Sequence, residues 1–382
     1  MKNAIFVLCM LKDSYAVGAC MCAYVHKSII KINNLNIDLV VMCDTYIYNK
    51  YNRMLKFYFD KVYKIDLLHY NVLSDKEPSE LNKKKYSWIG YSINKWQCLK
   101  YIEYQKILFL DVDILPMSLK FYDIYNFDTP AFYLMQHNNE ITAKTCINNT
   151  QIYDILVNFE SYNGYITNSN KSHYSLNGGI VLLRPDMYLY NEYIKFVDNI
   201  NIINNGIPQM STMGQSGIDE TTLFYFYVKH KKYTFYKICM DYMIIPWFDK
   251  LLDNIPPDKK IPTHSYNYLS FVKPWRKPSF ISFPEELIWR VIYKKMRKSL
   301  LFNKLYKETL VDGLKEYNEY NDILKNRFYG SNKQFTFDIT YENIVKHENI
   351  IFPTQKIYNF GILNVDNIEK LFKFMKKYKK QK

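Results

Sequence analysis

Two aspartates spaced two residues apart follow an apolar run, and such a pair could bind a divalent cation. Residues 107–110 are apolar, Asp111 and Asp113 come directly after them, and Pro116 ends the segment. In an extended chain, side chains two residues apart point to the same side, so both carboxylates can face one ion. A short apolar run is typical of a buried strand, and open α/β sheets bind ligands at the carboxyl ends of strands. Because Mg2+ and Mn2+ prefer oxygen ligands and bridge to phosphates, the segment predicts a metal and phosphate site.

The aspartate pair by itself is a weak signal. At ordinary aspartate frequencies, about one such pair arises by chance in a chain of this length, usually in a solvated loop. Whether the pair is a metal site or part of a solvated loop must therefore be judged from the rest of the chain.

Strands and helices alternate along the chain. Apolar runs predict strands and amphipathic segments predict helices; the strands are 4–10, 37–43, 61–65 and 107–110, and the helices are 15–31, 49–58 and 92–103. This alternation predicts an α/β fold with a Rossmann-like, mostly parallel, doubly wound sheet. Residues 66–88 are loop-like, and the later part of the chain predicts strands at 130–136 and 234–239, helices at 187–202 and 219–230, and a turn at 177–179 that enters another strand. No GxGxxG motif follows the first strand, which argues against a dinucleotide-binding fold.

The composition describes a chain that can bury a large core. Hydrophobic residues make up 48% of the 382, and the apolar runs fall short of the ~20 residues that span a bilayer. The N-terminal apolar run could be a signal peptide, but Lys12 and Asp13 interrupt it, so a buried strand is favoured. The 7 cysteines show no CxxC pair, which predicts reduced thiols in a cytoplasmic protein rather than disulfides or a zinc site.

The net charge of +14 lies mostly in the last quarter of the chain. Residues 276–382 hold 22 basic and 12 acidic residues, whereas residues 1–275 hold 29 and 25. We therefore expect a catalytic domain at 1–275, with a polar insertion at 137–174, and a basic, mainly helical extension at 276–382. In the extension, residues 287–301 alternate apolar and basic side chains near helical spacing. Such a helix either lies on an anionic membrane or acidic partner, or packs its apolar face on the catalytic domain.

Five further sequence features accompany the aspartate pair in a fixed order. They are the segment from Leu8 to Tyr15, the segment from Ser92 to Lys106, Asn177-Gly178-Gly179 before a strand that ends at Arg184-Pro185, Asp219-Glu220 at the start of a helix, and His264 followed by Lys273-Pro274-Trp275. Together they resemble the glycogenin and galactinol synthase family of retaining glycosyltransferases (family 8). The resemblance covers about residues 4–275 and implies a GT-A fold.

The resemblance implies how the donor diphosphate is held. Asp111, Asp113 and His264 match the family's manganese ligands, a set that would also accept Mg2+. Lys273 matches a lysine that contacts the diphosphate, and Tyr15 matches an aromatic residue that stacks on uracil. Without the resemblance, a single lysine or tyrosine of this kind is usually a surface or packing residue.

Other matched residues surround the transferred sugar. Lys95 matches a lysine near the donor sugar, Asn177 and Gly178 match residues around that sugar, and Asp219 matches the acid nearest the anomeric carbon. Lys95, Asn177 and Asp219 are therefore the predicted catalytic residues. The predicted contacts to the UDP-sugar also include Cys9, Leu11, Val112, Glu220 and Ser270.

The chain departs from the family pattern at several positions. Leu11 and Lys12 replace a threonine and an asparagine, which leaves the backbone to contact uracil there. Tyr86 replaces an arginine that contacts the phosphates, and the neighbouring Lys85 could substitute for it. Ser216 replaces an aspartate that contacts the sugar, and Ser270 stands at a glycine position. These changes leave the donor sugar open.

The sequence thus predicts a metal-dependent, retaining hexosyltransferase that uses a UDP-hexose. The acceptor is left open among a protein, including the chain itself, a glycan and a small polyol, and a homodimer is compatible with the pattern. One alternative is a catalytically idle glycosyltransferase-like scaffold. The other is a nucleic-acid-binding protein, which the near charge balance of residues 1–275 and the lack of a nucleic-acid motif disfavour.

Overall fold

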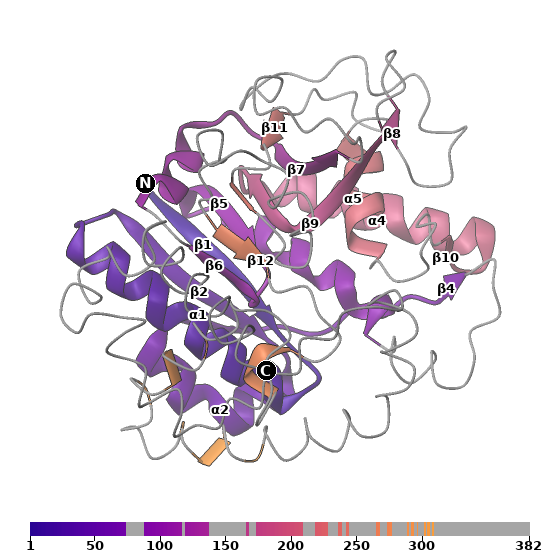
Figure 1. Ribbon diagram of the computed structural model, residues 1–382. Coiled ribbons are helices and arrows are strands. Elements are labelled where there is room, and N and C mark those ends of the chain that lie inside the picture. Colours follow the sequence, from indigo (N-terminus) through magenta and orange to yellow (C-terminus); the bar gives the residue numbers. More distant parts are fainter. Residues whose placement is uncertain are drawn as a thin grey trace, which may run out of the picture.

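The computed structural model describes the following parts of the chain. They are residues 1–73, 88–116, 119–136, 166–167, 173–208, 218–227, 236–238, 242–243, 265–267 and 273–276, and single residues between 289 and 308. An eight-stranded sheet organises these parts in the order β11-β7-β9-β5-β1-β2-β3, with β8 beside β9 (Figure 1). Its strands are β1 (Lys2–Cys9), β2 (Ile37–Cys43), β3 (Lys61–Lys64), β5 (Tyr104–Leu110), β7 (Ala131–Gln136), β8 (Ile166–Thr167), β9 (His173–Leu183) and β11 (Tyr236–Ile238).

One strand of this sheet runs against the others. Strand β1 pairs in parallel with β2 and β5, β2 with β3, and β11 with β7, whereas β9 is antiparallel to β5, β7 and β8. The predicted α/β fold with a mostly parallel sheet is confirmed, and β9 is the strand that makes the sheet mixed. The predicted turn at residues 177–179 is also wrong, because these residues lie inside β9. The pairing of β9 with β7 shifts register next to them.

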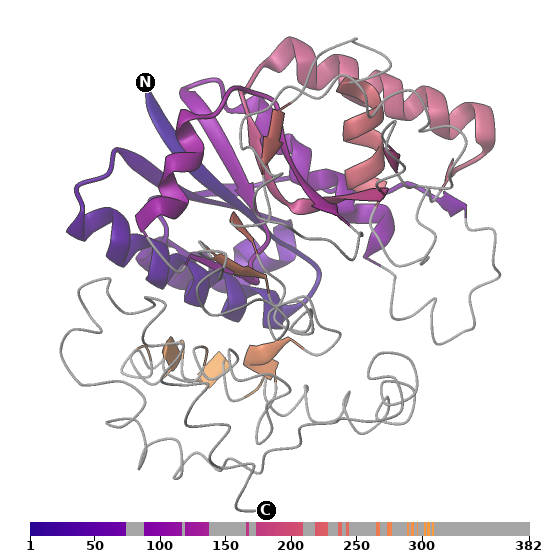
Figure 2. The ribbon, with the colours of Figure 1, turned by 45° about the horizontal axis from the view of Figure 1, so that its top comes forward.

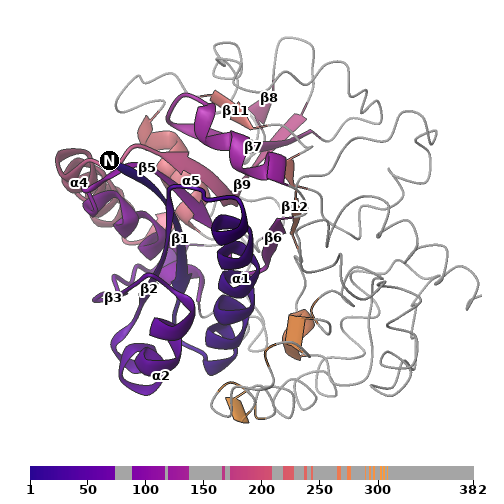
Figure 3. The ribbon, with the colours of Figure 1, turned by 90° about the vertical axis from the view of Figure 1, so that its left-hand side faces the viewer.

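Helices cover both faces of the sheet. The helices α1 (Asp13–Ile32) and α2 (Thr45–Tyr58) share a core with Ile5 and Val7 of β1. The opposite core holds Ala4 and Phe6 of the same strand with the 3-10 helix η1 (Ile89–Lys100), α4 (Met187–Asn204) and α5 (Ile218–Tyr225). This division follows from the alternation of side chains along a strand. Figure 3 shows α1 and α4 on opposite sides of the sheet, and Figure 2 separates the pink helices α4 and α5 from the indigo α1 and α2.

Two small sheets extend the fold beyond the predicted elements. Strand β6 (Ile114–Pro116) pairs antiparallel with β12 (Ser265–Asn267), with Ser265 opposite Pro116. Strand β4 (Val72–Leu73) pairs in parallel with β10 (Ile207–Pro208). Strand β4 lies in the predicted loop 66–88, of which residues 74–87 lie outside the described part. The β6–β12 pair matters for the site, because it brings the chain just after position 264 next to the strand that follows the aspartates.

Most predicted helices are present with shifted ends. Helix α2 begins earlier than predicted because Asp44 caps it, its Oδ1 accepting a hydrogen bond from the Ile47 backbone N at 2.7 Å. The predicted helix at 92–103 is the 3-10 helix η1, and β5 begins at Tyr104. Most of the predicted insertion 137–174 lies outside the described residues.

The thiols in the described residues agree with the predicted reduced state. Cys9, Cys20, Cys22, Cys43 and Cys98 are all free and buried. Among the helices that the structure describes, none has the length and apolar character that crossing a membrane requires.

Several described residues beyond position 276 pack on the core around α1 and α2. Five of them are buried in the core that also holds α1 and α2; they are Trp289, Ile292, Met296, Phe302 and Leu305. Phe302 makes an edge-to-face contact with Tyr58 of α2, with ring centroids 6.1 Å apart. Of the two alternatives for residues 287–301, the burial of Trp289, Ile292 and Met296 therefore favours packing of the apolar face on the core.

Candidate active site

The aspartate pair lies in a tight turn at the carboxyl end of β5. The Ile114 backbone N donates to the Asp111 backbone O at 3.0 Å and closes the turn between β5 and β6. The Asp111 backbone N donates to the Gly179 backbone O of β9 at 2.9 Å. The pair is thus at the predicted edge of the sheet, but the expected extended geometry is wrong. A turn rather than a strand sets the directions of the two carboxylates.

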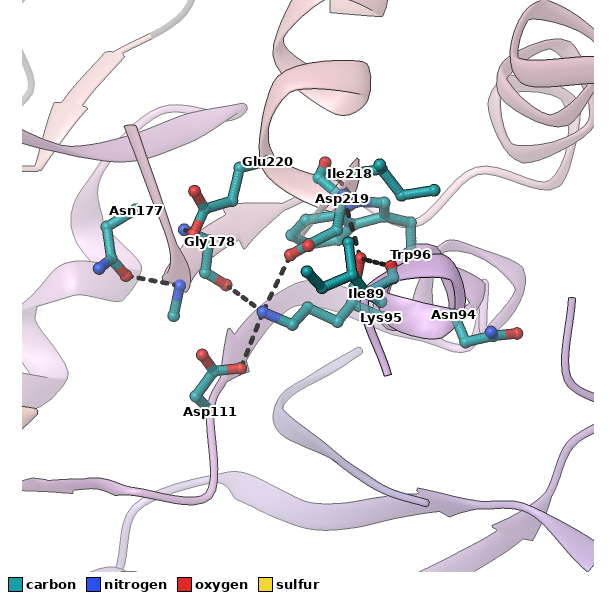
Figure 4. Close-up of polar contacts among 12 residues, drawn as sticks. Ile89, Asn94, Lys95, Trp96, Asp111, Asn177, Gly178, Ile218, Asp219 and Glu220 are labelled. Atoms are coloured by element: carbon teal, nitrogen blue, oxygen red, sulfur yellow. Dashed lines mark hydrogen bonds and ion pairs between the residues drawn. The ribbon is translucent and has the colours of Figure 1, made fainter. Parts of the chain in front are cut away.

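Lys95 joins the first aspartate to Asp219 (Figure 4). Its Nζ lies 3.0 Å from Asp111 Oδ1 and 2.9 Å from Asp219 Oδ2, and it also donates to the Gly178 backbone O at 3.4 Å. Only 9% of Lys95 is exposed. Burial lowers the pKa of Lys95, but the charges of Asp111 and Asp219 outweigh it and raise the pKa overall. Lys95 is therefore a buried ammonium group between two carboxylates.

Asp219 is fixed through its backbone to η1. The residue is 1% exposed and lies at the start of α5. Its backbone N donates to Ser92 Oγ at 3.3 Å, and its backbone O accepts from Trp96 Nε1 at 2.9 Å. Ser92 and Trp96 are not among the predicted site residues. Their positions in the same helical segment as Lys95 were the signal that could have found them, because one rigid element can hold both the lysine and its partner.

Two glycines let the surrounding groups approach each other. The Gly178 backbone N donates to Glu220 Oε1 at 2.7 Å, and a Cβ at Gly178 would lie 2.7 Å from Glu220 Cγ and 2.9 Å from Asp219 Oδ2. A Cβ at Gly179 would lie 2.8 Å from Asn177 Oδ1, which accepts from the Gly179 backbone N at 2.8 Å. Side chains at either position would push these polar groups apart. Asn177, Gly178 and Asp219, the residues predicted around the donor sugar, thus lie close together.

A second lysine pairs with the other aspartate. Lys273 Nζ donates to Asp113 Oδ2 in a close ion pair. Burial lowers the pKa of Lys273, and Asp113 and then Tyr15 raise it, with a net increase. Tyr15, the predicted uracil-stacking residue, lies in the first turn of α1 and is half-buried. The predicted diphosphate lysine and base-stacking residue therefore lie close enough for the charge of one to affect the other.

The loop after β1 is held by an aspartate that the sequence reading missed. Leu11 has a left-handed backbone with φ 67°, and its backbone N donates to Asp44 Oδ2 at 2.7 Å. Asp44 is buried and directly follows β2, so its position after a strand at the same edge was an available signal. Of the predicted contacts nearby, Cys9 ends β1 and is fully buried, and Val112 is buried in the aspartate turn.

The carboxylates of Asp111 and Asp113 are suitable ligands for a hard divalent cation. The buried Asp113 Oδ1 has no hydrogen-bond partner in the part of the chain that the structure describes. Carboxylate oxygens in this arrangement suit Mg2+ or Mn2+. No group of three or more His, Cys, Asp or Glu side chains that could hold an ion is found among the described residues. The predicted third ligand His264 lies outside them, as do Ser270, Tyr86, Lys85 and Ser216.

The burial of Glu220 predicts a pH dependence of stability. Burial, and then the charge of Asp219, raises the pKa of Glu220 to about 8 from an ordinary value near 4.5. Between these values the unfolded chain loses the proton and the folded chain keeps it, so the free energy of unfolding should fall as pH rises from about 4.5 to about 8. Glu220→Gln keeps the hydrogen-bond acceptor for Gly178 but cannot ionise. In this variant the free energy of unfolding should fall less steeply with pH, as measured by urea denaturation in a chelating buffer.

The control for this measurement is a surface glutamate. Glu103 accepts a hydrogen bond from Tyr63 Oη at 2.9 Å and its side chain is 44% exposed. Glu103→Gln should therefore keep the slope of the unmodified protein. An identical slope in the Glu220→Gln variant would contradict the assignment of the decline to Glu220.

Comparisons with known proteins give no family match. No protein-family model matches the chain, and no curated protein matches it. Among solved structures, the galactosyltransferase LgtC in complex with donor and acceptor sugar analogues matches 80% of this chain and 95% of its own, at 13% identity and a TM-score of 0.41. The glycosyltransferase GlyE of Streptococcus pneumoniae matches 81% of this chain and 64% of its own, at 11% identity and a TM-score of 0.44. Mouse xyloside xylosyltransferase 1 matches 70% of this chain and 98% of its own, at 11% identity and a TM-score of 0.35. At such scores the likeness does not decide function, which has to be argued from the site.

Proposed function

We propose that the chain is a metal-dependent glycosyltransferase that transfers a hexose from a UDP-sugar. The main support is the convergence of two lysine–aspartate systems at one edge of the sheet. Lys95 lies between Asp111 and Asp219, and Lys273 pairs with Asp113. This arrangement offers carboxylates for a cation and ammonium groups for phosphate oxygens, both of which a nucleotide-sugar donor needs.

The diphosphate side of the proposed site consists of the aspartate turn and Lys273. Asp111, Asp113 and His264 would hold Mn2+ or Mg2+, and the ion would supply Lewis-acid stabilisation of the departing diphosphate. The ammonium group of Lys273 would donate to phosphate oxygens, a contact stronger than one between neutral groups. Tyr15 would stack on uracil.

The sugar side of the proposed site consists of the groups around Lys95. Lys95, Asn177 and Asp219 would surround the transferred hexose, with Gly178 allowing a close approach. The proposed reaction retains the configuration at the anomeric carbon. It proceeds either by attack on the same face as the leaving group or through a short-lived glycosyl–Asp219 species.

The remaining parts of the proposal concern the chain around the site. Residues 1–275 would form the catalytic domain and residues 276–382 an extension. The acceptor is a protein, a glycan or a small polyol. A catalytically idle scaffold is the second candidate, and the Lys95 and Lys273 ion pairs argue against it. Buried charges are costly, so a protein without chemistry at this site has little reason to keep them.

Binding and hydrolysis of UDP-sugars test the proposal together. Calorimetric titration with UDP in the presence of Mn2+ should show saturable binding that chelation by EDTA abolishes. A panel of UDP-sugars should then reveal slow metal-dependent hydrolysis, which needs no acceptor. Absence of UDP binding with and without Mn2+ would reject the proposal, and binding without turnover of any donor would favour the idle scaffold.

A further inference from the structure

Trp275 lies at the junction between the proposed catalytic domain and its extension. It follows Lys273 by two residues, within the short 3-10 helix η9 (Pro274–Arg276), and it is fully buried. A rigid Pro274 separates it from Lys273, so the chain between the two has little freedom. A displacement of the Trp275 ring should therefore be transmitted to the lysine.

Helix α1 forms one side of the Trp275 pocket. A Cβ at Gly18 would lie 2.5 Å from the Trp275 ring, so the absence of a side chain there allows the ring to lie directly on the helix. Gly18 is one turn after Tyr15 in α1. The same helix thus carries the proposed base-stacking residue and supports the indole next to Lys273.

Trp289 from the extension forms another side of the pocket. Its ring centroid lies 4.9 Å from that of Trp275 at an interplanar angle of 56°, and it is fully buried. Ile292 and Met296 are buried as well, and their spacing from Trp289 is that of one helix face. The extension therefore contacts the catalytic domain next to Lys273, and two large indoles share the contact.

We propose that Trp289 is a positioning residue for Lys273, so that the extension helps to form the diphosphate site. The inference depends on the proposed function, because it takes Lys273 as the group that binds the donor diphosphate. Trp289 would fix Trp275 against α1, and Trp275 would keep the Lys273 ammonium beside Asp113. Loss of the Trp289 ring would leave a cavity into which Trp275 can move.

The test compares the affinities for UDP and UMP in the full chain with Mn2+. Trp289→Leu should weaken UDP binding about tenfold relative to UMP binding, because a misplaced Lys273 loses a charge-assisted contact to the diphosphate and uracil stacking is unchanged. Phe302→Leu is the matched control, since Phe302 is an equally buried aromatic of the extension that packs on Tyr58. It should lower the melting temperature and leave the UDP to UMP affinity ratio unchanged.

A second variant approaches the same pocket from the opposite side. Gly18→Ala forces a methyl group against the Trp275 ring. Like Trp289→Leu, it should lower the affinity for UDP relative to that for UMP. If Trp289→Leu does not fold, the ratio in Gly18→Ala tests the link from Trp275 to Lys273, without which the inference fails. An unchanged ratio in the folded variants, or an equal change in Phe302→Leu, would overturn the inference. Failure of the unmodified protein to bind UDP would instead reject the proposed function.

Discussion

Asp113→Asn is expected to lower turnover of a UDP-sugar by at least about 100-fold and to leave the protein folded. Asparagine has the same shape as aspartate, but it is a neutral and weaker ligand for a hard cation. A metal ion contributes several kcal/mol to such reactions, and each ~1.4 kcal/mol is a factor of ten in rate. The variant also removes the charge that pairs with Lys273, so the site should become more positive. Steady-state kinetics over a range of Mn2+ concentrations would measure the loss.

The control is an aspartate–lysine pair at the other end of the sheet. Asp38, at the start of β2, pairs with Lys2 Nζ at 3.1 Å. Asp38→Asn should leave turnover within about twofold, because an exposed ion pair contributes little. For the unmodified protein, EDTA should abolish turnover and added Mn2+ should restore it. Full activity of Asp113→Asn, or of the protein in EDTA, would refute the metal assignment.

Local patterns in the sequence were enough to predict the central part of the fold. The strands β1, β2 and β5 are apolar runs that a buried parallel strand requires, and each was predicted within a few residues of its ends. The reversed direction of β9 was not predictable in this way. Its apolar residues 180–183 suit a buried strand of either direction, and only long-range pairing with β5 and β7 sets the choice.

For the candidate site too, residues that belong to a local sequence pattern were predicted, and residues whose roles depend on long-range contacts were not. The aspartate pair, Lys95, Asn177 and Asp219 were predicted because their types and order in the chain match a known pattern, and the fold places them near one another. The supporting groups Ser92, Trp96 and Asp44 were missed because their roles depend on hydrogen bonds to backbone atoms that are distant in sequence. Their positions beside Lys95 and after β2 mark them as candidates, but a residue type alone does not show which distant backbone atom it bonds.

The buried ion pairs around Lys95 are better explained by a function than by a contribution to stability. Asp219 and Lys95 are almost fully buried, and taking an ion pair out of water costs about as much as its attraction returns. Burial also raises the pKa of Asp111, which Lys95 opposes. A chain selected for stability alone would gain by placing apolar residues there. Under the proposed function, the pairs are groups that exchange partners when an anionic donor and a cation bind.

Asp219→Asn should reveal whether the carboxylate that we propose nearest the anomeric carbon acts in the chemical step. We expect kcat to fall by about 100-fold or more and UDP affinity to change by less than about threefold, because the proposed uridine and metal contacts lie on other elements. Asp186→Asn is the matched control: Asp186 Oδ1 caps α4 by accepting from the Leu189 backbone N at 3.0 Å, and asparagine caps a helix equally well. Equal losses in kcat and in UDP affinity for Asp219→Asn would assign the residue to binding instead.

The stereochemistry of the product provides the stronger test of the same assignment. A UDP-hexose with an α-linked nucleotide should give an α-glycoside, because the proposed reaction is retaining and Asp219 is the carboxylate that we propose nearest the anomeric carbon. Proton NMR of the first-formed product distinguishes the two anomers before mutarotation. A β-anomer at that stage would refute retention and the resemblance on which it rests. An α-anomer formed by the unmodified protein, and formed about 100-fold more slowly by Asp219→Asn, would assign the carboxylate to the retaining step.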